Sequence, residues 1–232
     1  MIKGLKAIIP VREGSSRIKE KVLLPIGGKT LLGWKVSQLQ KVMPSKDICI
    51  STNSDRLIGI AKEMGVSYHR RSDYLSEGHE ASFSEVITGI VGEIEAEHIA
   101  WVTVVVPLMR PSEYEDAYAA YQQKVVEEGV NDSLVTVNKL KEYFWTEEGA
   151  FNYEATKNHT ISQELTPLYR VTNGLYMAPK KVIMKERYFL GTNPHLYEVP
   201  KIAGIDIDEI EDYNMSKYLL NMYFDVEFTD NK

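Results

Sequence analysis

Short apolar runs alternate with amphipathic stretches over the first 140 residues of the chain. The runs are rich in isoleucine and valine, as buried strands are, and the longer stretches repeat apolar residues at helical spacing. A polar cluster at 52–55 is suited to capping a helix that begins there. The pattern predicts strands over residues 5–11, 47–51, 66–69, 99–106 and 133–137, and helices over 30–42, 55–64, 83–95 and 111–126. Such an alternation is typical of a Rossmann-like α/β fold, in which a doubly wound, mainly parallel sheet carries helices on both faces.

The alternation stops after residue 138. Aromatic residues at 143–145 and 151–153 flank a turn at Glu148 and Gly149, which indicates a hairpin or a projecting arm. Exposed aromatic residues on an arm would suit a homodimer contact or a lid over a substrate, and packing into the core explains them equally well. Strand character returns over 174–178, and a last helix is predicted over 211–224. We interpret the chain as one domain, residues 1–232, with an excursion at about 139–172.

Charge and cysteine content narrow the class of protein. A formal net charge of −6 argues against general nucleic-acid binding, which usually requires a basic face. The single cysteine, Cys49, lies in an apolar run and permits no internal disulfide, which suggests a reducing compartment. The N-terminal region lacks the apolar core of a signal peptide, and no stretch is apolar for long enough to span a membrane. We therefore expect a cytoplasmic protein that binds neither nucleic acid nor membranes.

A basic loop that contains glycine follows the first predicted strand. It includes Arg12, Gly14, Arg17, Lys19 and Lys21, and it lies where ligands gather in parallel sheets, beyond the carboxyl ends of the strands. Backbone amides near the glycine can approach phosphate oxygens, and the cations can neutralise the charge that builds on a departing pyrophosphate. The loop is neither a Walker A motif nor a dinucleotide-binding glycine motif. The alternative is a solvated basic loop between a strand and a helix.

Asp206 and Asp208 form an acidic motif near the C-terminal end. Alternate residues of an extended segment point to one face, so the two carboxylates are expected about 7 Å apart. Oxygen ligands of this kind suit Mg²⁺, which takes one or two carboxylates and fills its shell with phosphate and water. Such an ion would polarise an α-phosphate for attack by a sugar hydroxyl. The alternative is a solvent-facing acidic strand end, because Glu209, Glu211 and Asp212 extend the negative run.

The sequence resembles a known enzyme family. Residues 9–21 (IPVREGSSRIKEK), followed by GKTLL at 28–32, resemble the opening of the acylneuraminate cytidylyltransferases, also called CMP-sialic acid synthetases. The resemblance extends along nearly the whole chain. It includes STNSD at 51–55, RRSDYLS at 70–76, PLMR at 107–110, YRVTNG at 169–174 with one extra residue, and IDID at 205–208 with Asp212.

The resemblance implies a homodimeric, Mg²⁺-dependent cytidylyltransferase that transfers CMP from CTP to an acidic sugar and releases pyrophosphate. It implies that Arg12 and Lys21 bind phosphate and stabilise the transition state, and that Asp208 also takes part in catalysis. The further roles that it implies are nucleotide binding by Arg12, Gly14, Ser15, Lys21, Arg71 and Ser82, sugar binding by Gln163, Arg170 and Asn173, and Mg²⁺ binding by Asp206 and Asp208.

Several positions depart from the family pattern. Val22 replaces the asparagine that normally follows the lysine, and residues 78–80 (GHE) replace a D-T-A-like stretch beside the base-binding loop. Residues 104–106 (VVV) replace a polar stretch, and Gln163 lacks the arginine that normally precedes it. Three functions therefore stay open: activation of a nonulosonic acid such as sialic acid, activation of another sugar such as a deoxy-octulosonic acid, and nucleotide binding without turnover.

Overall fold

Seven strands form one sheet in the order β11-β7-β10-β6-β1-β4-β5 in the computed structural model, which describes residues 2–14, 18–76 and 80–224. Parallel pairing joins β1 (Leu5–Pro10) to β4 (Ile48–Thr52) and β6 (His98–Val102), β4 to β5 (Ser67–Arg70), and β7 (Ser133–Leu140) to β11 (Pro194–Glu198). β10 (Leu168–Pro179) runs antiparallel between β6 and β7. The predicted doubly wound, mainly parallel α/β fold is confirmed.

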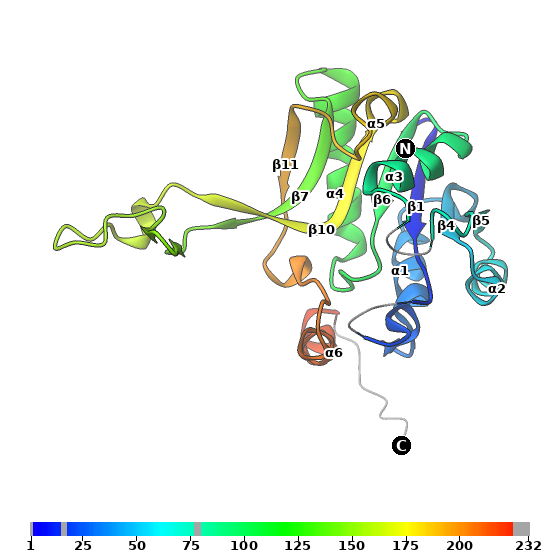
Figure 1. Ribbon diagram of the computed structural model, residues 1–232, viewed down its shortest axis with the longest axis horizontal. Coiled ribbons are helices and arrows are strands. Elements are labelled where there is room, and N and C mark those ends of the chain that lie inside the picture. The colour runs from blue at the N-terminus through cyan, green and yellow to red at the C-terminus, as the bar shows by residue number, and fades with distance from the viewer. Residues whose placement is uncertain (1, 15–17, 77–79, 225–232) are drawn as a thin grey trace.

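Helices cover both faces of this sheet (Figure 1). α1 (Leu31–Leu39), α2 (Asp55–Glu63) and α4 (Pro111–Tyr121) pack on one face, and α3 (Phe83–Glu93) and α5 (Lys180–Glu186) pack on the other. Successive side chains of a strand point to opposite faces. Thus Ile9 of β1 is buried in the cluster with α1 and α2, whereas Ile8 is buried in the cluster with α3.

The C-terminal helix α6 (Ile210–Phe224) packs beside the first loop, at the end of the sheet toward which β1 points (Figure 1). The hydroxyl of Tyr213 donates a 2.6 Å hydrogen bond to the backbone oxygen of Pro25 in the ribbon formed by β2 (Pro25–Ile26) and β3 (Lys29–Thr30). Gly27 connects the two short strands with a φ of +56°, and a Cβ there would lie 2.6 Å from the ring of Trp34. α6 is therefore anchored to the loop that the sequence identifies as phosphate-binding.

Between β7 and β10 the chain forms a long arm that projects from the body (Figure 1). The ends of β7 and β10 pair at its base, from Leu140↔Leu168 to Val137↔Val171. Beyond them β8 (Trp145–Thr146) and β9 (Gly149–Ala150) form the hairpin that the aromatic pattern predicts. The rings of Tyr143, Tyr153 and His159 contact one another, and Trp145 and Phe151 are exposed.

The structure corrects three element predictions. β6 ends at Val102, and the apolar residues up to Val106 leave the sheet, although Val104 and Val106 stay buried, Val104 in the cluster with α1 and α4. The helix predicted to residue 126 is α-helical to Tyr121 and continues as a π-helix, Gln122–Glu127. The strand predicted over 174–178 spans Leu168–Pro179. The sequence pattern also failed to indicate α5 and β11, which are short and partly exposed.

No helix within the described part of the chain is both long enough and apolar enough to cross a membrane.

Candidate active site

A crevice lies beyond the carboxyl ends of β1, β4 and β5. Its cavity has a volume of about 530 Å³, and its walls include Arg12, Gly14, Asn53, Ser54 and Ser76. This is the edge where ligands bind in parallel α/β sheets. The structure thus places Arg12 and Gly14 where the sequence predicts a nucleotide. Ser15 and Arg17 lie outside the described residues, and so do Gly78 and His79.

Arg71 lies buried beneath this crevice. Its guanidinium donates to the backbone oxygen of Val11 (3.0 Å) and to the hydroxyl of Ser76 (2.9 Å). Burial, and to a smaller extent the nearby guanidinium of Arg12, lower the pKa of Arg71 to about 10. Two neighbouring cations of this kind create a positive site that suits an anion such as a phosphate.

Lys21 joins the basic loop to the acidic motif. Its Nζ donates a 2.7 Å hydrogen bond to the backbone oxygen of Ile207, which lies between Asp206 and Asp208. The amide of Ile207 donates in turn to the backbone oxygen of Val105, 2.8 Å away. The two motifs that carry the chemistry are therefore adjacent in space, although 186 residues separate them in the sequence.

Asp206 has one oxygen without a partner. Its Oδ2 accepts a 2.9 Å hydrogen bond from Asn173, whereas Oδ1 is buried and has no hydrogen-bond partner among the residues that the structure describes. Burial raises the pKa of Asp206, against the opposing effect of the Asn173 hydrogen bond, and the neighbouring Asp208 raises it further. An orphaned buried carboxylate oxygen is unfavourable unless a proton or a cation satisfies it.

The rest of the acidic run has a structural use. One oxygen of Asp212 accepts hydrogen bonds from the amides of Asp208 (3.0 Å) and Glu209 (2.8 Å) at the start of α6. Asp212 therefore fixes the backbone at Asp208, whose side chain is exposed. This arrangement leaves Asp206 and Asp208 as the candidate metal ligands.

The donor set fits Mg²⁺. The carboxylates of Asp206 and Asp208 flank Ile207, the residue that Lys21 binds, and Asp206 holds the orphaned oxygen. In the described ranges no group of three or more His, Cys, Asp and Glu side chains could enclose a metal. Mg²⁺ commonly binds through one or two carboxylates and completes its shell with phosphates and water, so this sparse set suits it.

The three predicted sugar-binding residues lie in different places. Asn173, with a φ of +59°, lies at a break in the pairing of β10 and holds Asp206. Arg170 donates to Asn138 (2.7 Å) and to the backbone oxygen of Gly204 (3.3 Å), and thus supports the segment before Asp206. Gln163 lies out on the arm, where its backbone oxygen accepts from Lys141, so it is not part of the crevice of its own chain.

Ser82 and Val22 serve the fold. The hydroxyl of Ser82 caps α3: it accepts from the amide of Glu85 (3.3 Å) and donates to the Glu85 carboxylate (2.6 Å). A role for Ser82 in nucleotide binding stays a prediction. Val22 is buried in the core. Its apolar side chain supplies no polar contact to the crevice, as expected where valine replaces the asparagine of the family pattern.

Sequence comparison decides the family. A profile described as Cytidylyltransferase matches residues 6–224. The chain belongs to the cytidylyltransferase family.

Named relatives within this family act on acidic sugars. The chain is 22% identical over 218 residues to an N-acylneuraminate cytidylyltransferase of Streptococcus agalactiae, across 89% of this chain and 51% of that protein. It is 22% identical over 233 residues to a pseudaminic acid cytidylyltransferase of Campylobacter jejuni, across 95% of this chain and 98% of that protein. The chain therefore spans about half the length of the first relative and nearly all of the second.

Solved structures show the same fold. A CMP:2-keto-3-deoxy-manno-octonic acid synthetase complexed with CTP superposes with a TM-score of 0.67 at 15% identity, across 95% of this chain and 99% of that one. A 4-diphosphocytidyl-2C-methyl-D-erythritol synthase of Anaerococcus prevotii gives 0.63 at 14% identity, across 94% and 99%. The chain thus shares the fold of these two structures.

An aromatic cluster lies beside the acidic motif, and the sequence pattern does not indicate it. The hydroxyl of Tyr176 donates to Asn173 (2.5 Å), and its ring lies 4.0 Å from that of Phe189. Phe189 contacts Tyr188 (4.3 Å) and Phe83 (5.5 Å), both of which are exposed. The Tyr188-Phe189 pair was the available signal, but it follows α5, which the sequence pattern failed to indicate. The cluster therefore connects Asn173, through Tyr176 and Phe189, to two exposed aromatic rings.

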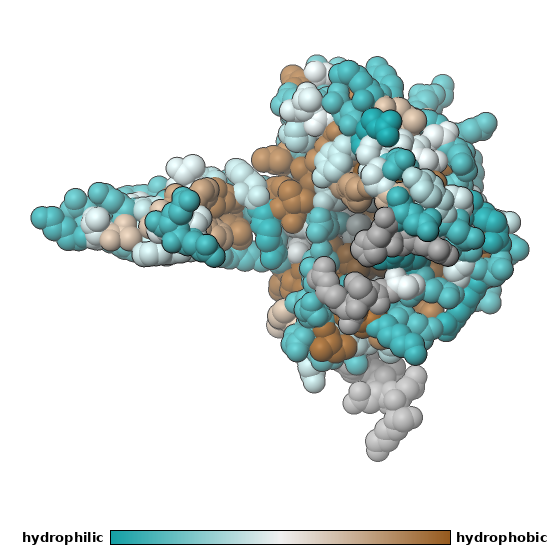
Figure 2. Space-filling model, viewed as in Figure 1, coloured by the Kyte–Doolittle hydropathy of each residue, from teal (hydrophilic) through white to brown (hydrophobic). Residues whose placement is uncertain are grey.

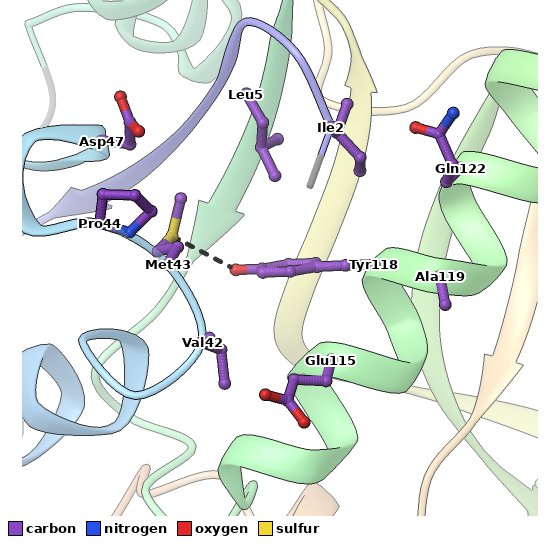
Figure 3. A pocket seen from close by; sticks show the side chains of 10 residues that line it. All are labelled: Ile2, Leu5, Val42, Met43, Pro44, Asp47, Glu115, Tyr118, Ala119 and Gln122. Carbon is purple, nitrogen blue, oxygen red and sulfur yellow. Dashed lines mark hydrogen bonds between the residues drawn. The ribbon is translucent and has the colours of Figure 1, made fainter.

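A second pocket lies at the opposite end of the sheet (Figure 3). It has a volume of about 350 Å³ and is lined by residues that include Leu5 at the start of β1, Met43 and Tyr118. The hydroxyl of Tyr118 points at the sulfur of Met43, 3.8 Å away (Figure 3). Because this pocket is at the amino end of β1, it is separate from the candidate active site.

Proposed function

We propose that this chain transfers CMP from CTP to an acidic nonulosonic-type sugar, sialic acid or a relative, with release of pyrophosphate. The observation that carries the proposal is the hydrogen bond from Lys21 to Ile207, because it joins the phosphate-binding loop to Asp206 and Asp208. The names of the two relatives support the sugar class. We place the reaction in the cytoplasm, in line with the single buried cysteine and the need for a nucleoside triphosphate.

In this reaction a sugar hydroxyl attacks the α-phosphorus of CTP in line, the bond to the pyrophosphate oxygen breaks, and the hydroxyl proton leaves to water. Arg12 and Lys21 neutralise the charge that develops on the departing pyrophosphate. Mg²⁺, held by Asp206 and Asp208, would supply Lewis acidity at the phosphate. Asn173 orients Asp206 through the 2.9 Å hydrogen bond to its Oδ2. No covalent intermediate is required, since positioning and charge neutralisation lower the barrier.

The aromatic cluster supports a sugar that carries apolar substituents. Phe83 and Tyr188 are exposed, and Phe189 and Tyr176 connect them to Asn173. Acyl groups of a nonulosonic acid can pack on such rings, whereas a deoxy-octulosonic acid carries no acyl group. We therefore favour an acylated sugar and keep the deoxy-octulosonic acid as the second candidate.

The arm supports a homodimer. Trp145 is 64% exposed and Phe151 is 62% exposed at its hairpin, and Figure 2 shows apolar residues along an otherwise polar projection. An isolated projection has little core of its own and exposes apolar surface that a partner would bury. In such a dimer Gln163 would reach the sugar site of the other subunit, which explains its distance from its own crevice.

The test combines nucleotide binding with turnover. Thermal shifts are measured with CTP, UTP, ATP and GTP, with and without Mg²⁺, and pyrophosphate release is then measured with sialic, pseudaminic and deoxy-octulosonic acids. We expect a shift with CTP, and release with a nonulosonic acid. Release with the deoxy-octulosonic acid alone would select the second candidate, and binding of CTP without any release would indicate a nucleotide-binding protein without turnover.

A further inference from the structure

Helix α1 has a polar face inside the core. Lys35 is fully buried, and its Nζ donates to the backbone oxygen of Val106 (2.7 Å) and to the hydroxyl of Tyr114 (2.6 Å). One turn further, the buried Gln38 donates to the backbone oxygens of Pro107 (3.0 Å) and Met109 (2.6 Å). Trp34 adds a 2.9 Å bond to Pro107. Three side chains of one helix therefore hold three backbone carbonyls of one connection.

That connection, residues 103–110, supports the acidic motif. The backbone oxygen of Val105 accepts the amide of Ile207 at 2.8 Å, and Ile207 is the residue to which Lys21 also binds. The hydroxyl of Thr103 donates to the backbone oxygen of Asn173 (2.7 Å), and the side chain of Asn173 donates to Asp206. The connection thus contacts both the segment that carries the two aspartates and the residue that orients one of them.

Nothing in the packing of the core alone requires a lysine here. Burial in apolar surroundings disfavours an ammonium group and lowers the pKa of Lys35 to about 7, although Glu113 opposes the shift. Gln38 is also costly, because its Oε1 is buried without a hydrogen-bond partner among the described residues. Apolar residues of similar volume would avoid these two penalties but would leave the buried backbone oxygens that Lys35 and Gln38 bind without these donors, so both polar groups indicate a requirement for directed contacts.

We propose that Lys35 and Gln38 form an internal clamp that positions Asp206 and Asp208 through the 103–110 connection. The clamp touches no substrate, so both are positioning residues. The inference rests on the proposed function for its effect on turnover but not for its effect on structure. The clamp explains why two polar residues of α1 are buried on the side of the helix that faces residues 106–109.

The first experiment measures positioning without activity. Lys35→Met and Gln38→Leu remove the donors at similar volume, and Gln40→Leu is the matched control. Gln40 lies at the end of the same helix and also donates to a backbone oxygen, that of Met64 (2.9 Å), but this oxygen is in another loop. Hydrogen exchange followed by mass spectrometry is measured on the full chain. We expect exchange at Ile207 and its neighbours to rise about tenfold in the first two variants and to stay unchanged in the control.

The second experiment measures the reaction. We expect Lys35→Met and Gln38→Leu to lower kcat by about tenfold or more and to raise the Mg²⁺ concentration for half-maximal rate, with the Kd for CTP within about twofold of wild type. Gln40→Leu should keep wild-type values. If Lys35→Met does not fold, Gln38→Leu decides.

Two outcomes have different meanings. If both clamp variants are folded and show wild-type exchange at Ile207, the inference is overturned, whatever the enzyme does. If the wild type transfers no cytidylyl group to any acidic sugar, the proposed function fails, and the exchange experiment still decides whether the clamp exists.

Discussion

At the scale of single residues, Asp206 shows a conflict between stability and function. Its Oδ1 is buried without a partner among the described residues, and burial raises the pKa of its carboxyl group. A charge in such a place destabilises the fold in the absence of a cation. The conflict is resolved if Mg²⁺ and phosphates complete the site during the reaction.

The first prediction follows from that conflict. Asp206→Asn should leave the metal-free protein as stable as wild type or more so, while it lowers Mg²⁺-dependent pyrophosphate release by about 100-fold or more. Calorimetry without metal and a Mg²⁺ titration of the rate would measure the two effects. Asp116→Asn, an exposed position on α4, is the control and should change neither. A variant with wild-type kinetics would remove Asp206 from the metal site.

Lys35 supports a prediction about pH and stability. Its pKa is about 7 in the folded chain and about 10.5 when exposed, so the unfolded chain binds more protons between these values. The free energy of unfolding should therefore rise with pH in this window, by up to about 1.4 kcal/mol per pH unit. Lys35→Met should abolish this rise. The comparison is made by urea unfolding between about pH 7 and pH 8.5, because higher values ionise cysteine and tyrosine in the unfolded chain and add the opposite slope. Equal slopes in both proteins would mean that Lys35 titrates normally.

At the scale of elements, the helix starts were predictable because capping is local. Ser54 accepts a hydrogen bond from the amide of Leu57 at the start of α2, where the polar cluster at 52–55 predicts a helix. β6 was predicted too long because its apolar pattern continues to Val106, and burial under α1 looks the same in sequence as burial in a sheet. β11 was missed because it is a short edge strand with no fully buried residue.

Ser82 at the start of α3 gives a prediction at this scale. Ser82→Ala should lower the free energy of unfolding by about 1 kcal/mol, because the capping box with Glu85 is lost. Ser82→Asn should restore most of this stability, since asparagine also caps helices well. Denaturant titrations measure the free energy of unfolding of each variant. Calorimetric titrations with CTP measure the affinity for the nucleotide separately from the effect of the helix cap on stability. If Ser82→Asn is stable but binds CTP about tenfold more weakly, the hydroxyl also contacts the nucleotide.

At the scale of the whole molecule, the sequence predicted candidates for the chemistry but not which of them lie close together. The doubly wound fold implies that loops at the carboxyl ends of strands lie close together, which brings Arg12 near Arg71. The contact between Lys21 and Ile207 depends on how α6 returns to the first loop through Tyr213, and no local pattern contains that information. The buried contacts of Lys35 and Gln38 could not be predicted either, because a lysine on an amphipathic helix normally faces water.

The arm gives the last prediction, which concerns two subunits at once. If Gln163 serves the site of the partner subunit, each active site takes Lys21 from one subunit and Gln163 from the other. Lys21→Ala and Gln163→Ala then each remove one of these two residues. A mixed dimer then contains one site with both residues intact and one site with neither. After equal amounts of the two inactive variants exchange subunits, random pairing should restore about a quarter of the wild-type rate. A mixture of Lys21→Ala with the double variant Lys21→Ala/Gln163→Ala is the control and should stay inactive. Sedimentation of the wild type as a monomer, or a mixture that stays inactive despite subunit exchange, would show that the arm does not supply Gln163 in trans.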